Sequence, residues 1–411
     1  MTSLDIDFAR SRFPGLRNGW VFFDNAGGTQ ITDLAVERMQ DFLFNMNVQI
    51  GGSYEVSQQA AAALQAGREA MRTLINANRP EEIAFAHSTT VALQNLARSL
   101  AHQLAPGDEI IVTNADHESN IGPWASLARQ GIRIRTWKLD RDTLALDRTQ
   151  LVSLLNERTR LVAVTHVSNI LGTINPIREI ADIVHEHGAR ICVDSVAFAP
   201  HRAIDVRELD VDFLAFSLYK VFGPHAAVLY GKYAEFAELD NLYHYFYGKD
   251  KIPAKLEPGN ANYELAYASV GIVDYLSALA ERSGHAGSPR ESIESAFALI
   301  TAHEALLGER LLAYLRGRDD CQIAGLERGD DPNRVPTISF VIDGKDPGWI
   351  AREMDAHKIA IRFGDFHARR LAEYLDLGDG KGCVRVSMAH YNSLEEVDRL
   401  ISALDGILKR Q

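Results

Sequence analysis

The sequence predicts an α/β protein in two domains, the larger of which is built from βαβ units. Short apolar segments of strand length alternate with segments of helical periodicity from residue 81 to residue 233. Several of these strands run directly into polar residues, and open α/β sheets place ligand-binding groups at such strand ends. The length of 411 residues exceeds what one small core needs and suits two lobes of unequal size.

The N-terminal part is expected to contain a strand and two helices. In Trp20–Gln30, WVFFDNAGGTQ, an apolar strand runs into Asn25 and two glycines. The glycines form either a tight turn or a place where the backbone approaches a ligand closely. Apolar spacing predicts helices over Thr32–Phe44 and Gln58–Ile75. Tyr54 lies in the loop between them and could reach a substrate, although exposed loop tyrosines without such a role are more common.

The next strand, Glu81–His87, leads into a helix that opens with Ser88-Thr89-Thr90 and runs to about Leu104. Hydroxyl residues are common helix caps, and the free amides of a helix start also bind phosphate. Later strands end near His117 and near Asn169, and helices over about 120–130 and 177–187 supply the crossovers. Polar groups at several strand ends on one sheet edge suggest a shared cleft.

The stretch Ala189–His225 carries the clearest chemistry. An apolar strand over residues 191–193 ends in Asp194, and a second strand, Phe213–Phe216, ends in a polar turn with Lys220. A lysine amine can hold an aldehyde cofactor as a Schiff base, and a carboxylate can keep the cofactor's pyridine nitrogen protonated. The pair predicts an enzyme that uses pyridoxal 5'-phosphate.

The remaining chain predicts one more strand in AAVLYGKY, an irregular aromatic loop over residues 243–264, and a helix over about Leu265–Ala280. The segment ERSGHAGSPR that follows is the best domain boundary in the chain. Beyond it, the pattern predicts a helix and then alternating strands and helices, with strands near residues 336–342, 359–362 and 384–389. We therefore expect a large cofactor-binding domain over residues 20–280 and a small domain over residues 1–19 and 281–411.

Composition excludes several classes of protein. The net charge of −12, the pI near 5.6 and the lack of a basic run disfavour a nucleic-acid surface. No segment reaches the roughly 18 apolar residues of a membrane helix, and the acidic N-terminus is unlike a signal peptide. Cys192, Cys321 and Cys383 are widely spaced and odd in number, which suggests neither disulfides nor a metal site. We expect a cytoplasmic protein.

Nearly the whole chain, from FFDNAGGTQ to VRVSMAHYNSLEEVDRL, resembles the class V aminotransferase group of pyridoxal-phosphate enzymes. The segments EIIVTNADHESNIGPW, LVAVTHVSNILGTINPIREIA and DFLAFSLYKVFGPHAAVLYGK carry the resemblance, which extends to group II cysteine desulfurases and cysteine desulfurase-like proteins. It implies the pyridoxal-phosphate-dependent transferase fold, type I. That fold has a large domain with a mostly parallel seven-stranded sheet and a smaller C-terminal α/β domain.

The resemblance also implies a role for individual residues. Lys220 would hold the cofactor, accept the substrate and act as acid and base at the α-carbon. Asp194 would pair with the pyridinium nitrogen, His117 would stack on the ring, and Asn169 would hydrogen-bond the phenolic oxygen. Singly, each residue has an ordinary structural interpretation, but together, in family order, they favour the cofactor site.

Further residues match the binding positions of the family. Those at the phosphate positions are Thr89, Thr90, Ser217 and Tyr219. Asn260 matches a residue that reaches the phosphate of the neighbouring subunit, which implies a homodimer with shared active sites. Arg385 matches the arginine that takes the carboxylate of a small amino-acid substrate, a task suited to a bidentate donor. Asn25 and Tyr54 are further candidates for substrate contact.

The pattern departs from that of the desulfurases at the residue that defines them. They need a mobile cysteine to carry sulfur, and the aligned position here is His367, in AIRFGDFHARRLAEYL. Cys383 shares a strand face with Arg385, but a packed, inert cysteine is the better interpretation there. Ala197 replaces a glutamine that would bond the phenolic oxygen, and Tyr219 replaces a histidine. These changes disfavour desulfuration through a persulfide.

The leading hypothesis is β-elimination, with C–S cleavage of cysteine or of an S-substituted cysteine. Lys220 would remove the α-proton, and His367 would either protonate the leaving group or have no role. The same α-carbanion could instead lead to epimerisation, as in relatives like isopenicillin-N epimerase, or to transamination. A desulfurase that uses Cys383 is a weaker alternative, and a non-catalytic protein that binds pyridoxal phosphate is a remote one.

Overall fold

Seven strands form the large sheet, and all but one of them are parallel. A computed structural model describes residues 3–409, so residues 1–2 and 410–411, the outer limits of the predicted small domain, lie outside the described residues. The sheet has the order β2-β8-β7-β6-β5-β3-β4, with β8 antiparallel to both neighbours. In that order the strands are Ile83–Ala86, Ala227–Gly231, Phe213–Ser217, Arg190–Asp194, Thr159–Thr165, Glu109–Thr113 and Arg133–Trp137.

Helices cover both faces of this sheet. Alternate residues of each central strand point to opposite faces, so each of these strands contributes side chains to two cores. Val162 and Val164 of β5 belong to a core shared with α7 and α11, whereas Leu161 and Ala163 belong to a core shared with α4 and α5. The middle residues of these central strands are therefore apolar on both faces, as expected for strands buried on two sides. The helices of this domain are α2 Asp33–Asn45, α3 Glu55–Leu74, α4 Thr89–Ala101, α5 Gly122–Ser126, α6 Arg148–Leu154, α7 Ile177–Glu186, α8 Val206–Leu209, α9 Tyr233–Glu238, α10 Tyr263–Ala268 and α11 Val270–Arg282.

The second domain is a four-stranded antiparallel sheet in the order β12-β13-β10-β9, with a core of its own. These strands are Arg362–Gly364, Cys383–Ser387, Thr337–Ile342 and Cys321–Ala324. A short parallel pair, β1 Val21–Phe22 and β11 Ile359–Ala360, lies beside them. The end of α12 Pro289–Arg316, α13 Pro347–Asp355 and α15 Leu394–Leu408 contribute to the core of this four-stranded sheet, whereas α1 Ile6–Ser11 and α14 Arg369–Tyr374 contribute to the core of the large sheet.

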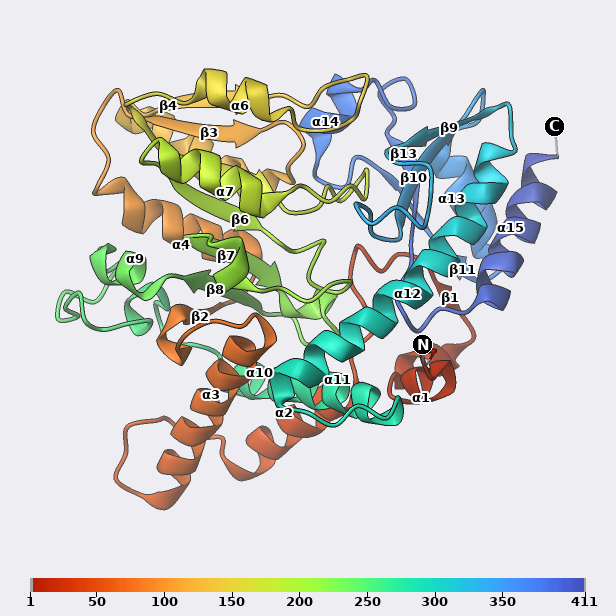
Figure 1. The fold of residues 1–411 in the computed structure, drawn as a ribbon. Coiled ribbons are helices and arrows are strands. Elements are labelled where there is room, and N and C mark those ends of the chain that lie inside the picture. Colours follow the sequence, from red (N-terminus) through yellow and green to blue (C-terminus); the bar gives the residue numbers. More distant parts are fainter. Residues whose placement is uncertain (1–2, 410–411) are drawn as a thin grey trace.

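Helix α12 connects the two domains. It packs on α11 at its start and reaches α15 and β9 at its end, as its diagonal course in Figure 1 shows. The predicted fold class, a mostly parallel seven-stranded sheet with a smaller C-terminal α/β domain, is confirmed. Within residues 3–409, no helix combines the length and the apolar character needed to cross a bilayer.

Two strands lie where the sequence analysis predicted none, and the one strand predicted near residues 359–362 is two strands, β11 and β12, in different sheets. β4 is an edge strand whose alternating residues, RIRTW, are partly exposed, so it lacks the apolar run of the central strands. β9 is also an edge strand, of only four residues. The helix predicted over residues 265–280 is two helices, α10 and α11, which meet at Ser269.

Gly67 of α3 is expected to be essential for the packing of α3 on α10. A Cβ atom at this position would lie 2.2 Å from the carbonyl oxygen of Ala266. Alanine normally stabilises a helix relative to glycine, but here it must displace backbone. We expect Gly67→Ala to lower the free energy of unfolding by about 1–3 kcal/mol, measured by denaturant unfolding. Gly406→Ala in α15, where the added Cβ meets nothing within 4 Å, is the control and should be neutral or stabilising.

Candidate active site

A cavity lies at the carboxyl ends of the central strands of the large sheet. All predicted cofactor-binding residues except Asn260 line it. They are Thr89, Thr90, His117, Asn169, Asp194, Ser217, Tyr219 and Lys220. His117 and Asn169 each lie four residues beyond the end of their strand, so irregular segments and not the strands themselves carry them into the cavity.

Lys220 and Asp194 occupy neighbouring strand ends. Lys220 closes a short 3₁₀ turn directly after β7, and Asp194 is the last residue of β6. Burial, together with the positive charge of Arg385, lowers the pKa of Lys220 to about 8. Burial raises the pKa of Asp194. The Asp194 carboxylate accepts the Val196 N–H at 2.9 Å and faces the Ser119 hydroxyl at 3.5 Å.

These groups fit pyridoxal phosphate. Asp194 is a buried carboxylate without a cationic hydrogen-bond partner, so a protonated ring nitrogen beside it would lower its pKa and be stabilised in return. The Oδ1 atom of Asn169 is buried without a hydrogen-bond partner. The hydroxyls of Thr89 and Ser217 lie 2.7 Å apart at the start of α4, and a helix N-terminus with hydroxyl donors suits a phosphate group.

His117 is held in one tautomer. The Ser119 N–H donates to its Nδ1 at 3.1 Å, so Nδ1 is unprotonated and the neutral ring carries its proton on Nε2. Burial and the nearby charge of Lys220 lower the pKa of His117 to about 4. The ring centroid of His367 lies 5.3 Å away. At neutral pH, His117 can therefore stack on a ring and donate a hydrogen bond from Nε2, but it is a poor base.

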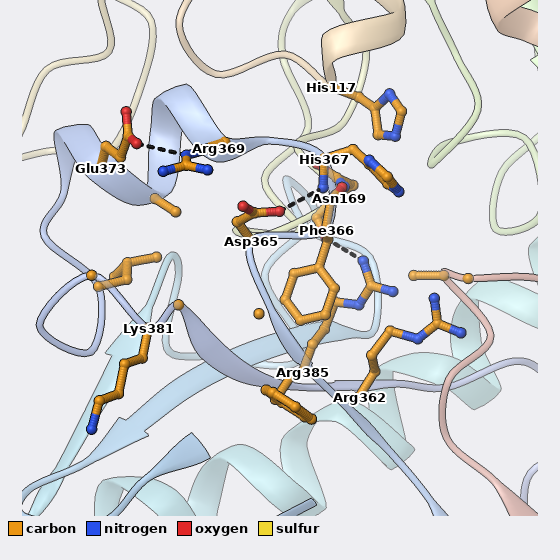
Figure 2. Close-up of a pocket in the computed structure, with 18 of the residues that line it drawn as sticks. His117, Asn169, Arg362, Asp365, Phe366, His367, Arg369, Glu373, Lys381 and Arg385 are labelled. Carbon is orange, nitrogen blue, oxygen red and sulfur yellow. Dashed lines mark hydrogen bonds and ion pairs between the residues drawn. The ribbon is translucent and has the colours of Figure 1, made fainter. Parts of the chain in front are cut away.

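A second, larger cavity of about 550 Å³ opens outward from the first and shares His117, Asn169, Tyr219 and Lys220 with it. Its other wall comes from the small domain, chiefly residues 362–369, α14 and residues 380–382 (Figure 2). This cavity lies between the two domains and joins the cofactor residues to Arg385. It is the candidate substrate-binding space.

Arg385 is almost fully buried in this wall, with a side chain 2% exposed. Its guanidinium stacks on the Phe366 ring at 3.9 Å and donates to the Asn169 carbonyl and to Asp24 Oδ1, each at 3.2 Å. Its Nε atom is buried without a hydrogen-bond partner. An oriented guanidinium with an unused N–H is suited to bind a substrate carboxylate.

Arg362 lies opposite Arg385 in the β12–β13 register, and the two guanidinium groups lie next to one another in Figure 2. Asp24 bridges them, since its Oδ2 is 2.7 Å from Arg362 and its Oδ1 is 3.2 Å from Arg385. Sequence reasoning missed Asp24, Arg362 and Phe366. An acid before NAGG and an arginine at the start of RFGDFH are only weak signals, because neither motif shows which residue the charged side chain will contact.

Three predicted residues do not line either cavity of the site. Asn25 is buried, and its side chain bonds the carbonyls of Phe22 and Ser387 and the hydroxyl of Tyr391, so it links β1 to the small domain. Tyr54 is half exposed at the start of α3. Asn260 lines a separate hollow beside His87.

The three cysteines are free, and none of them lines either of these two cavities. Cys383 is fully buried on β13, where burial raises the pKa of its thiol to about 11. Cys192 lies in the core of the large sheet, and Cys321 lies at the far edge of the small sheet. Among the described residues, the site therefore offers an imidazole at position 367 and no thiol.

The lowered pKa of Lys220 predicts how the cofactor-free protein takes up pyridoxal phosphate. Only the neutral amine can attack an aldehyde, so the rate constant should rise with pH up to about 8 and then level off. Stopped-flow absorbance over about pH 6 to 9 would measure it. The same reaction with an acetylated free lysine corrects for titration of the reagent. A rise that continues toward 10.5, the ordinary lysine value, would contradict the prediction.

Comparison with known proteins agrees with this geometry. A family model described as aminotransferase class V matches residues 21–286 and 291–400. The chain is 42% identical to the aminotransferase-like protein FGM3 of Gibberella zeae, over 99% of both proteins. It is 35% identical to the cysteine desulfurase-like protein ustD of Aspergillus flavus, over 99% of this chain and 91% of that protein.

Among solved structures, the cysteine desulfurase of Thermococcus onnurineus superimposes with a TM-score of 0.88 at 26% identity, over the whole of both chains. The family model and the relatives each span almost the entire chain, so the similarity includes both domains and the cleft between them. The chain belongs to the class V aminotransferase family and is a cysteine desulfurase-like enzyme that depends on pyridoxal 5'-phosphate.

Proposed function

We propose that this enzyme cleaves the C–S bond of an S-substituted cysteine, or of cysteine itself, by β-elimination. The observation that carries the proposal is the identity of the group at residue 367, an imidazole where desulfuration through a persulfide needs a thiol. The cavity of about 550 Å³ also leaves room for a substituent on the substrate sulfur. The products would be a thiol and, after hydrolysis, pyruvate and ammonia.

Bound pyridoxal phosphate supplies electron withdrawal from the substrate's α-carbon. The residues of the chain would do the rest. Asp194 would keep the ring nitrogen protonated, and Arg385 would bind and orient the substrate carboxylate. Lys220, released as a neutral amine, would take the α-proton on Nζ, which its lowered pKa favours.

His367 would donate a proton to the departing sulfur. Its ring lies on the substrate side of His117, in the wall of the larger cavity. An imidazole can serve as an acid near neutral pH, and a poor thiolate leaving group needs such an acid more than a good one does. The proposal therefore predicts that the contribution of His367 to the rate increases as the pKa of the leaving thiol rises.

Product analysis of the holoenzyme with cysteine and a panel of S-substituted cysteines tests the proposal. Pyruvate together with a released thiol supports it. Alanine with transferable sulfur would instead indicate a desulfurase and bring Cys383 back as the carrier. A keto acid that forms only with an acceptor keto acid would indicate an aminotransferase, and α-hydrogen exchange with inversion would indicate an epimerase. No reaction with any amino acid would favour a non-catalytic protein.

His367→Asn should lower kcat by about 10²-fold for substrates with alkyl thiol leaving groups. For substrates that release an acidic aromatic thiol, the same variant should lose much less, because the leaving group departs without a proton. Parallel kinetics of the two substrate types would measure this difference. Equal losses for both would show that His367 has no role as the acid.

The proposal includes a cytoplasmic homodimer with shared sites. Asn260 lies away from the cofactor cavity of its own chain, as expected of a residue that serves a neighbouring subunit. Tyr243, Tyr245 and Phe246, on the loop that leads toward Asn260, are strongly exposed, and exposed aromatic clusters favour interfaces. The free cysteines agree with a reducing compartment. Sedimentation of the holoenzyme tests the dimer.

A further inference from the structure

We call residues 362–370 the strap, and we call the cavity of about 550 Å³ the outer cavity. The strap begins in the small domain, forms part of the wall of the outer cavity and leads to the large domain. β12 pairs with β13 at the start of the strap, and α14 continues from its end. In Figure 1, α14 lies near the large-domain elements β3 and α6, away from α13 and α15. Arg141 of the large domain stacks on Tyr374 of α14 at 4.5 Å. The strap is therefore fixed by β13 at its start and, through α14, by the large domain at its end.

The middle of the strap has an unusual backbone. Phe366 and His367 have φ values of 50° and 59°, a left-handed conformation that non-glycine residues adopt only when their surroundings favour it. Two hydrogen bonds from the large domain hold this conformation. Asn169 Nδ2 donates to the Phe366 carbonyl at 2.9 Å, and the Glu118 N–H donates to the His367 carbonyl at 2.8 Å.

Glu118 holds the strap a second time, through its side chain. Its carboxylate accepts two bonds from the Arg370 guanidinium, from Nε at 2.9 Å and from Nη2 at 3.1 Å. This is a bidentate pair, the geometry that fixes orientation as well as distance. Glu118 directly follows His117 in the chain. One residue of the large domain therefore connects the segment that carries His117 to the strap that carries His367.

We propose that Glu118 and Arg370 are positioning residues that hold the His367 imidazole beside His117 and over the substrate cavity. The inference rests on the proposed role of His367 and adds the contacts that place it there. The two ring centroids are 5.3 Å apart, on segments from different domains. Glu118 follows His117 directly in the chain, and Arg370 lies three residues after His367. Without the ion pair, the strap keeps its backbone tethers but loses the contact that fixes the orientation of residues 367–370.

The effect of the pair should be modest and specific. Both side chains are about half exposed, at 51% and 48%, and exposed ion pairs contribute little free energy. We therefore expect Glu118→Arg or Arg370→Glu to lower kcat by about three- to tenfold and to leave cofactor binding unchanged. The double variant, with the charges exchanged, should return to within about twofold of the original enzyme, because the pair is restored.

The test compares the holoenzyme, Glu118→Arg, Arg370→Glu and the double variant by hydrogen–deuterium exchange and by steady-state kinetics. The expected result is faster exchange over residues 363–371 and a lower kcat in both single variants, with both reversed in the double variant. Arg310→Glu is the matched control. It breaks an exposed pair with Asp398, between α12 and α15, and should change neither quantity.

Unchanged exchange in the single variants would overturn the inference, as would a double variant that is no better than the single ones. Faster exchange with an unchanged kcat would also overturn it, because the strap would then move without consequence for the chemistry. The exchange measurement does not depend on which reaction the enzyme catalyses. Failure of the β-elimination proposal would instead be seen in the product analysis and in His367→Asn, with the exchange result unaffected.

Discussion

Replacement of Lys220 by alanine is expected to lower kcat by about 10⁴-fold or more. The Lys220 amine binds the cofactor covalently and transfers the α-proton of the substrate, and an alanine at this position can do neither. In the part of the chain that the structure describes, no other lysine lines the cavity that contains the cofactor-binding residues. Lys381, in the wall of the outer cavity, is 63% exposed and paired with Asp346, so it cannot take over either task.

Steady-state kinetics and the absorbance of the bound cofactor would measure this loss. The absorbance band of the lysine-bound cofactor should disappear, while the phosphate contacts still retain some cofactor. Added methylamine should restore part of the activity, because it supplies a neutral amine in the space that the side chain leaves. Lys249→Ala, at an exposed pair with Glu238, is the control. A Lys220→Ala enzyme that kept a few per cent of its activity would refute the assignment.

Replacement of Arg385 by lysine should have the second largest effect, a fall in kcat/KM of about 10²- to 10³-fold. Lysine keeps the charge but loses the planar fork, the stacking on Phe366 and the bonds to Asn169 and Asp24. The loss should appear for every substrate with an α-carboxylate.

Competitive inhibition distinguishes a lost carboxylate contact from a damaged site. An amine inhibitor that lacks the α-carboxylate should bind the Arg385→Lys enzyme and the original enzyme almost equally well. Arg362→Lys is the comparison variant, and a smaller effect is expected because the Arg362 side chain is 57% exposed and its ion pair is with Asp24 at 2.7 Å. If the two arginine variants lost activity equally, the carboxylate would be held by the pair and not by Arg385 alone.

The cofactor side of the cleft could be predicted from the sequence to a large extent. Asp194 and Lys220 follow apolar strands directly, and parallel strands bring their carboxyl ends to one edge whatever the details of the sheet. His117 and Asn169 lie four residues beyond their strands, and their loop conformations are not written in any periodicity. Their placement was predictable only through the resemblance to a family.

The substrate side could not be predicted in this way. Asp24 meets Arg385 across 361 residues, and Glu118 meets Arg370 across 252. The periodicity of hydrophobic residues and the turn signals report on residues that are close in the sequence. They therefore cannot show which charged residues the two domains bring into contact. For the same reason, the sequence could not show that the four side-chain partners of Asn25 come from the small domain and β1 and that Asn25 lines neither cavity of the site.

The strap also limits what a single substitution could achieve at this site. His367→Cys would restore the nucleophile of a sulfur carrier at the right place along the chain. Delivery, however, requires the loaded sulfur to leave the cleft and meet an acceptor outside, and here the carbonyls of residues 366 and 367 are both bonded to the large domain. The new thiol could take up sulfur as a persulfide, but it could not carry that sulfur out of the cleft to an acceptor. A route from this enzyme to a sulfur donor would therefore need a longer or looser strap before a cysteine became useful.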